Sequence, residues 1–152
     1  MTDDRDSLRA WLALLSASNT IKKTIDARMR QNFGLSISRF DVLAALDRAG
    51  GEGATAGALS AYLKVTDGNT TQVTAPLIVA GLVQRSASPS DGRVAIFRLT
   101  KKGRRIFADM ADANRRWVAE SFSALSPAQV SNLRGLLNAL GHPASQFEEE
   151  AA

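Results

Sequence analysis

Apolar residues near the start of the chain recur every three or four positions and predict one long helix. Asp6 or Ser7 can cap its beginning, and Gly34 is a typical helix end. The apolar positions of this helix are Leu8, Trp11, Leu12, Leu15, Ile21, Ile25 and Met29. A helix over about residues 7–33 is longer than is usual in a compact domain, so we expect part of it to pack against a second copy of the chain.

Further along the chain, two short helices are expected with almost no linker between them. Thr55 can cap a helix over residues 56–63, and Thr66 can cap another over residues 67–80. Such a tight connection predicts a helix-turn-helix pair, in which the second helix reads DNA.

The second helix of this pair has an apolar face and a polar face. Val73 and Leu77 are four positions apart and are expected to face the core. The opposite face holds Asp67, Gly68, Asn69, Thr71, Gln72 and Ala75. Asn and Gln side chains can pair with adenine through two hydrogen bonds, so this face suits base reading. The predicted DNA contacts from this helix are Thr66, Asn69, Thr71 and Gln72. Pro76 lacks an amide hydrogen, so the helix should bend there.

A β-hairpin is expected next, because the pattern changes to strand, turn and strand. The strands are predicted over residues 82–87 and 93–99, around a turn at residues 88–92. Basic residues gather in and after this hairpin, and in the same stretch only Asp91 opposes them. They are Arg85, Arg93, Arg98, Lys101, Lys102, Arg104 and Arg105. Such a local positive field suits a surface that contacts phosphates.

Arg93 lies just past the turn and has two interpretations. Its guanidinium can enter a narrow minor groove, where A·T-rich sequence concentrates negative potential. Alternatively, it pairs with Asp91 and stabilises the hairpin. Arg85 and Arg98 can contact phosphates, or they are solvated charges on an exposed hairpin. Asp91, Arg85, Arg93 and Arg98 are therefore the predicted DNA-binding residues of the hairpin.

Other helices flank these elements. Ser36 or Ser38 can open a helix that the glycine-rich run at residues 50–53 ends. Thr100 can cap a long helix after the hairpin, with apolar positions at Ile106, Met110, Ala113, Trp117 and Phe122. The segment Ser126–Pro127–Ala128–Gln129 is a capping box with proline at the first helical position, and it opens a last helix.

Together these elements predict one mainly α-helical domain with a small β-hairpin wing, a winged helix-turn-helix over residues 1–152. Its DNA-binding lobe is expected at about residues 36–100. Long helices at about residues 7–33 and 101–141 flank this lobe.

Composition narrows the possible chemistry. A net charge of +4 occurs in many proteins that never meet nucleic acid, so only its local distribution is informative. The chain has no cysteine and one histidine, His142, which rules out thiolate sites and leaves too few ligands for a transition metal. We expect neither metal nor cofactor. No apolar run approaches the roughly 20 residues that span a bilayer, and the acidic start is unlike a signal peptide, so the predicted location is cytoplasmic.

The hairpin and the residues before it form a recognisable set. Asp91–Gly92–Arg93 is followed by Leu99–Thr100–Lys101–Lys102–Gly103, and Leu59–Ser60, Thr66 and Gly81–Leu82–Val83 precede it at matching spacing. In these residues the chain resembles the MarR family of winged-helix transcription regulators. The resemblance runs over about residues 35–103, and the flanking helices extend it to nearly the whole chain.

This resemblance implies an obligate homodimer on a double-stranded palindromic operator. The first, fifth and sixth helices of both subunits, at about residues 7–33 and 101–141, are expected to interlock as dimerisation helices. The resemblance also implies a repressor that releases DNA when a small, often aromatic and anionic, effector enters a pocket between the dimer helices and the DNA-binding lobe. There are two departures. Gly92 stands where many members have a second arginine, and no Lys or Arg lies between Lys64 and Arg85. Phosphate contacts must then come from the wing and from helix N-termini.

An effector pocket for an aromatic acid needs aromatic walls and a cation. Arg39, in the first turn of the second helix, can meet a carboxylate with help from that helix's amides, or it can pair with a nearby acid of the chain. Trp11 is a candidate wall. Trp11, Trp117 and Phe122 can equally form the dimer core.

An enzyme and a protein-binding module are the two alternative functional classes. An enzyme without a cofactor would need a nucleophile with its base, paired carboxylates or a metal site, and the sequence holds no G-x-S-x-G, phosphate loop or H-E-x-x-H motif. The closer alternative is a winged helix that binds another protein, because the DNA-reading helix lacks cations.

Overall fold

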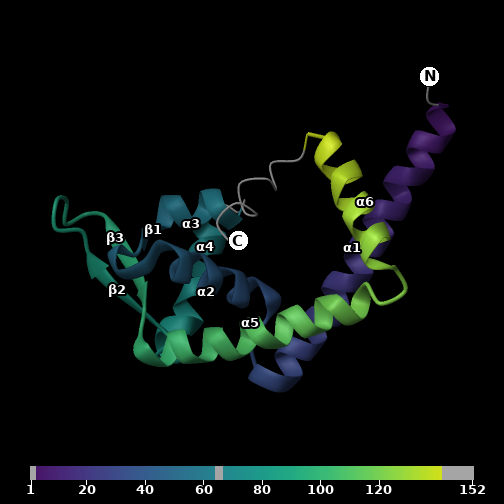
Figure 1. Cartoon of the computed structure of the whole chain (residues 1–152). Coiled ribbons are helices and arrows are strands. Elements are labelled where there is room, and N and C mark those ends of the chain that lie inside the picture. The colour runs from purple at the N-terminus through teal and green to yellow at the C-terminus, as the bar shows by residue number, and fades with distance from the viewer. Residues whose placement is uncertain (1–2, 64–66, 142–152) are drawn as a thin grey trace. The chain divides into compact units, whose positions relative to one another are not determined.

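The computed structural model describes residues 3–63 and 67–141, with the backbone alone at residues 67–69 (Figure 1). The helices are α1 (Asp4–Phe33), α2 (Ile37–Ala49), α3 (Ala56–Leu63), α4 (Asp67–Val79), α5 (Lys101–Ser121) and α6 (Pro127–Ala139), with a 3-10 turn η1 (Gly50–Glu52). The strands are β1 (Ala54–Thr55), β2 (Val83–Ala87) and β3 (Ala95–Leu99). This confirms the mainly helical class with a small sheet. Across the described ranges, no helix combines the length and apolar character needed to cross a membrane.

The chain divides into two compact units, Met1–Arg115 and Arg116–Ala152. The first contains every element from α1 to the sheet and most of α5. The second contains the end of α5 and all of α6. The winged helix-turn-helix lies entirely in the first unit.

The first helix begins earlier than the sequence predicted. Asp3 is its N-cap and accepts a hydrogen bond from the Arg5 N–H at 3.2 Å, so the expected caps Asp6 and Ser7 lie inside the first turns and that prediction was wrong. Asp4 and Asp6 in the first turn complement the helix dipole, which favours the earlier start. The end is as predicted, because Gly34 adopts the left-handed conformation that a helix C-cap favours.

The core of the first unit surrounds α2, which packs against α1, α3, α4 and β3. The fully buried large side chains include Met29, Val42, Leu43, Leu46, Leu59, Leu77, Val83 and Met110. Phe40 of α2 stacks on Phe107 of α5, with ring centroids 5.6 Å apart. Burial of these apolar side chains supplies the main stabilisation of the unit.

Asp26 joins α1 to the start of α2. Its carboxylate accepts a hydrogen bond from the Ile37 N–H and forms an ion pair with Arg30, each at 2.8 Å. The backbone hydrogen bond first, and then the arginine, lower the pKa of Asp26 below its ordinary value. Ser36 is the N-cap of α2, which decides between the two caps that the sequence allowed.

The sheet has the order β1-β3-β2, with antiparallel pairing throughout. The hairpin β2–β3 was predicted, but β1 was not, because a two-residue strand has no periodicity to detect. The second hairpin strand begins at Ala95 rather than Arg93. Arg93 and Val94 belong to the turn instead, where the Val94 N–H bonds the Asp91 carbonyl at 3.0 Å.

Glycine and threonine fix the joint between the hairpin and α5. Thr100 caps α5 as predicted, because its hydroxyl accepts from the Gly103 N–H at 3.0 Å and donates to the Gly81 carbonyl at 2.6 Å. A Cβ on Gly103 would overlap the carbonyl oxygen of Leu82. Only glycine therefore lets α5 pack this closely on the chain between α4 and β2.

In the second unit, the predicted capping box is confirmed. Ser126 Oγ accepts from the Gln129 N–H at 3.2 Å, and Gln129 Oε1 accepts from the Ser126 N–H at 2.8 Å. Phe122 lies just beyond the end of α5, where its N–H bonds the Val118 carbonyl, so its predicted place on that helix was wrong by one residue.

Candidate nucleic-acid interface

Helices α3 and α4 form the predicted helix-turn-helix pair. Thr55 caps α3, because its hydroxyl accepts a hydrogen bond from the Ala58 N–H at 3.1 Å. Thr66, the predicted cap of α4, lies outside the described residues, as does the side chain of Asn69. Their roles as DNA contacts stay predictions.

The buried face of α4 is more polar than expected. Leu77 is buried as predicted, but Thr70 and Thr74 are buried beside it, while Val73 is only half-buried. The Thr70 hydroxyl lies 2.7 Å from the hydroxyl of Ser60 on α3. Thr74 donates its hydroxyl to the Thr71 carbonyl at 3.3 Å. Helical spacing of the two threonines with Leu77 was the signal that sequence reasoning overlooked.

The exposed face of α4 carries Thr71, Gln72, Ala75 and Val79. Thr71 and Gln72 are exposed within the first turns of the helix, and their base contacts stay predictions. No Lys or Arg occurs anywhere on α4. The helix continues through Pro76 to Val79, and the Ala80 N–H bonds the Pro76 carbonyl at 3.0 Å.

The hairpin turn holds Arg93 by its backbone and its side chain. The Asp91 carboxylate accepts from the Arg93 N–H at 3.0 Å and from Arg93 Nε at 3.2 Å. These hydrogen bonds, the backbone one first, lower the pKa of Asp91. The Arg93 side chain is nevertheless 91% exposed, so the ion pair orients the guanidinium without covering it. Both interpretations of Arg93 are therefore compatible.

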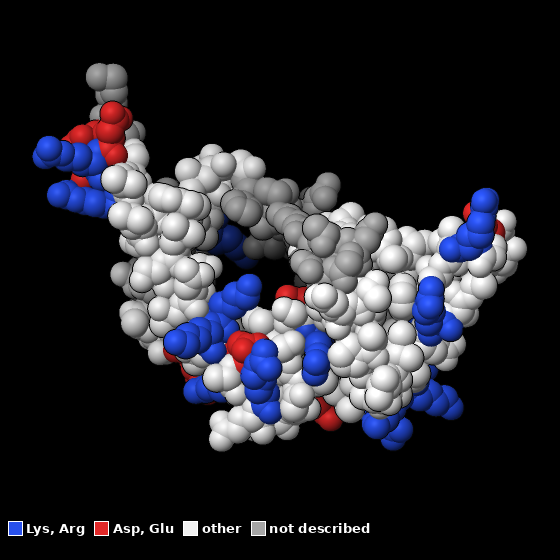
Figure 2. Space-filling view, turned by 180° about the vertical axis from the view of Figure 1, so that it is seen from behind, with Lys and Arg blue, Asp and Glu red and all other residues white. Residues whose placement is uncertain are grey.

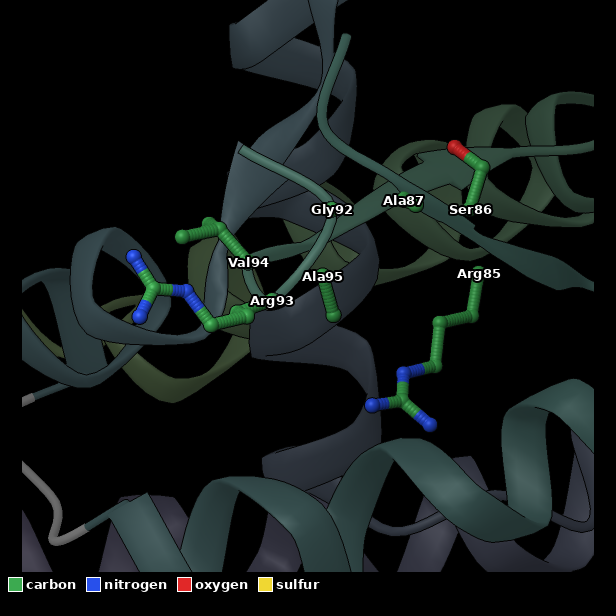
Figure 3. A pocket seen from close by; sticks show the side chains of 7 residues that line it. All are labelled: Arg85, Ser86, Ala87, Gly92, Arg93, Val94 and Ala95. Atoms are coloured by element: carbon green, nitrogen blue, oxygen red, sulfur yellow. The ribbon is translucent and has the colours of Figure 1, made fainter. Parts of the chain in front are cut away.

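Arg85 projects from β2 and is exposed. A shallow hollow of about 250 Å³ on the hairpin is lined by Arg85, Ser86, Ala87, Gly92, Arg93, Val94 and Ala95. Arg85 and Arg93 leave the hairpin in different directions around it (Figure 3). Figure 2 shows basic side chains at the tip of the hairpin projection and along it, with an acidic group beside the tip. The hairpin thus offers separate cationic groups to a polyanion.

Arg98 differs from Arg85 and Arg93 because it is half-buried and its guanidinium is hydrogen-bonded to two other segments of the lobe. Its Nε donates to the Gly51 carbonyl and its Nη1 donates to Ser86 Oγ, each at 2.8 Å. The predicted phosphate contact of Arg98 is not tested by this geometry.

Basic residues after the hairpin are also divided between structure and surface. Lys102 Nζ donates to the Ala80 carbonyl at 3.2 Å, and Arg104 Nη1 donates to the Leu99 carbonyl at 3.3 Å. Lys101 and Arg105 are exposed. Part of the basic run therefore ties α5 to the hairpin and to the end of α4.

The effector candidates lie on two different helices of the first unit. Trp11 on α1 is 54% exposed, and Arg39 in the first turn of α2 is half-buried. The Arg39 N–H bonds the capping Ser36 hydroxyl at 3.3 Å. Among the described residues Arg39 forms no ion pair with an acid. Near it on α2, burial raises the pKa of Asp41 to about 6, and Lys22 only partly opposes that rise.

No metal centre emerges from the described ranges, where no group of three or more His, Asp or Glu side chains could hold an ion.

Comparison with known sequences points in the same direction. Residues 33–94 match the model of the MarR family. The chain is 29% identical over 132 residues to the HTH-type transcriptional repressor IacR of Pseudomonas putida, covering 87% of this chain and 76% of that protein. It is 26% identical over 144 residues to the HTH-type transcriptional regulator MhqR of Bacillus subtilis, covering 95% and 97%.

Solved structures share the fold. A MarR family transcriptional regulator of Streptomyces coelicolor, Sco3205, in complex with DNA, superposes with a TM-score of 0.82 at 20% identity, covering 93% of this chain and 89% of that one. The transcriptional regulator BldR of Sulfolobus solfataricus gives a TM-score of 0.78 at 24% identity, with 93% and 99% covered. At these identities the likeness shows the fold alone.

Proposed function

We propose that the chain is a DNA-binding transcription regulator of the MarR family and not an enzyme. In this proposal it acts as a homodimeric repressor that a small aromatic acid releases from its operator. Because its proposed target is genomic DNA, we expect it to act in the cytoplasm.

One observation supports the proposed DNA-binding surface. The exposed, uncharged residues of α4 lie in the same lobe as a hairpin with two exposed arginines. Gln72 and Thr71 can hydrogen-bond base edges in the major groove. Arg93, oriented by Asp91 and open to solvent, suits the narrow minor groove. Arg85 adds a second cation on the same hairpin for a phosphate.

Exposed apolar residues on α1 support the homodimer. Leu8 is 56% exposed, and Trp11 and Leu12 are each 54% exposed. A contiguous apolar face of this kind marks an interaction surface, and its burial is worth about 25 cal/mol per Å². A second copy of the chain is the occupant that a palindromic operator requires, because the two-fold axis of a dimer matches the inverted repeat.

Control by an effector rests on Arg39 and on the repressor relative. A half-buried guanidinium with no acid partner among the described residues can bind a carboxylate at the start of α2. A ligand of this type releases DNA only if it binds the DNA-free arrangement of the dimer more tightly than the DNA-bound one. The relative named as a repressor supports repression rather than activation.

Binding to genomic fragments tests the proposal directly. Fragments are selected with the purified protein and then titrated in gel shifts at two salt concentrations, while light scattering gives the oligomeric state. We expect a dimer, a palindromic operator and an affinity that falls steeply with salt. A monomer, or binding with no preference among fragments, contradicts the proposal. The latter result favours the protein-binding module that the uncharged α4 also allows.

The effector is tested separately with benzoate and related aromatic acids. We expect some of them to raise the melting temperature and to release the operator. The variant Arg39→Gln should bind DNA normally but respond to higher acid concentrations only. An unchanged response of this variant removes Arg39 from the effector site.

A further inference from the structure

Arg98 joins three segments that are distant in sequence. It lies on β3, its Nε donates to the Gly51 carbonyl of η1, and its Nη1 donates to Ser86 Oγ of β2, each at 2.8 Å. Arg98 pairs with Gln84 across the ladder, so Ser86 is its diagonal neighbour further along the hairpin. One guanidinium on β3 thus links η1 to β2.

The loop before β1 is shaped to meet this side chain. Gly53 has a φ of 74°, and a Cβ at this position would overlap the Phe97 carbonyl and the Arg98 side chain. The loop therefore lies flat on β3, and its Gly51 carbonyl is presented to Arg98 Nε. Glycine at residue 53 is required both by its backbone angle and by this close approach.

In the described part of the chain, the outer part of the hairpin is held by pairing between β2 and β3 and by contacts within its own turn. β1 pairs only with Phe97 and Ile96, so beyond Ile96 the wing is a two-stranded ribbon. Isolated two-stranded ribbons are marginally stable in water. Arg98 reaches Ser86, which is opposite Ile96, and so fixes the ribbon at the point where support by β1 ends.

We infer that Arg98 is a positioning residue that clamps the wing to the body of the lobe, and that it does not serve as a phosphate contact. It fixes the angle at which Arg85 and Arg93 meet DNA. This inference rests on the proposed DNA-binding function and changes the role that the sequence alone suggested for Arg98.

The salt dependence of operator binding separates the two roles. Loss of a phosphate contact lowers the slope of log K against log salt, whereas loss of a clamp lowers K at every salt concentration. We expect Arg98→Gln to weaken operator binding about tenfold with no change in slope. Ser86→Ala removes only a neutral acceptor, and we expect it to weaken binding about threefold, again with no change in slope.

A conservative variant sharpens the distinction. Arg98→Lys keeps the charge but cannot reach both acceptors with a planar fork. A clamp therefore predicts that Arg98→Lys binds as weakly as Arg98→Gln, and a phosphate contact predicts near-normal binding. The double variant of Ser86→Ala with Arg98→Gln should bind no worse than Arg98→Gln, because both changes break the same link.

Hydrogen exchange of the free protein reports on the clamp without DNA. Amides of residues 83–99 should exchange faster in Arg98→Gln, Arg98→Lys and Ser86→Ala than in the wild type. Arg85→Gln is the matched control: it should lower the salt slope and leave exchange in the hairpin unchanged.

A lower salt slope in Arg98→Gln, with normal binding by Arg98→Lys and Ser86→Ala and normal hairpin exchange, overturns the inference. If Arg98→Gln does not fold, Ser86→Ala alone decides between the two roles. If the wild type selects no operator, the proposed function fails, while faster hairpin exchange in the variants still demonstrates the clamp.

Discussion

Helix α4 and the β2–β3 hairpin contrast in how they could meet DNA. α4 exposes Thr71 and Gln72 and has no cation, whereas the hairpin exposes Arg85 and Arg93. Phosphate attraction is independent of sequence, and base contacts are not. In the proposed regulator, the hairpin would therefore supply mainly affinity, and the helix mainly discrimination between DNA sequences.

The two regions are also held in different ways. α4 is held by its buried face, which includes Thr70, Thr74 and Leu77. The hairpin is fixed by polar contacts, at the tip through Asp91 and Arg93 and near its base through Arg98. Salt screens the exposed ion pair at the wing tip, whereas the buried side chains Thr70, Thr74 and Leu77 are uncharged and are not screened in this way.

Gly103→Ala disturbs the joint between the two regions and should have the largest effect. The added methyl group would overlap the Leu82 carbonyl between α4 and β2, so we expect the free energy of unfolding to fall by about 3 kcal/mol. Urea denaturation measures the change. Gly57→Ala is the control, because an added Cβ there meets only the Thr55 hydroxyl at 3.9 Å. Equal stability of the two variants would contradict the close packing at Gly103.

Arg93→Ala tests whether the hairpin contributes a cationic contact to DNA. We expect operator binding to weaken by about 1–3 kcal/mol and the salt slope to fall by about one unit per subunit, because a cation at the groove is lost. Gel shifts at several salt concentrations measure both quantities. Arg5→Ala removes the same charge from α1 and should change neither. An unchanged slope for Arg93→Ala would leave the arginine as a partner of Asp91 only.

Patterns among neighbouring residues predicted much of this site, whereas the sequence did not reveal contacts between segments that are far apart in the chain. Thr55 and Thr100 each cap a helix through a bond to a residue three positions on, and Asp91 bonds Arg93 two positions on. Interactions over so few residues can be inferred from their spacing in the sequence. The bond from Arg98 to Gly51 joins residues 47 apart in sequence. No periodicity encodes such a contact, and the same is true of the two-residue strand β1.

Gln72→Ala tests whether α4 discriminates between DNA sequences. We expect a loss of about 1–2 kcal/mol at the operator and little change on non-specific DNA, because Gln72 would contact a base and not a phosphate. The salt slope should stay constant, in contrast to Arg93→Ala. Gln31→Ala, at an exposed position near the end of α1, is the control. Equal losses on operator and non-specific DNA would remove Gln72 from base reading.

Asp41 lies on α2, outside both regions, so Asp41→Asn shows how a change elsewhere in the lobe affects stability and operator binding. Burial raises the pKa of Asp41 from 3.8 to about 6, so the folded chain holds this proton more tightly than the unfolded chain. The resulting stabilisation is complete below pH 3.8 and is lost as the pH rises through 6, which leaves a half-buried charge at pH 7. Screening by solvent and by Lys22 limits the cost, so Asp41→Asn should raise the free energy of unfolding at pH 7 by about 1 kcal/mol.

Urea denaturation of wild type and Asp41→Asn between pH 4 and pH 7 measures this gain, with the exposed Asp47→Asn on the same helix as the control for a lost charge. The gain should vanish toward the acidic end, where the wild-type carboxyl is protonated. Operator affinity should be the same in wild type and variant at pH 7. If Asp41→Asn instead changed operator affinity more than Gln72→Ala, α2 would be coupled to DNA binding, and the two-region division would be incomplete.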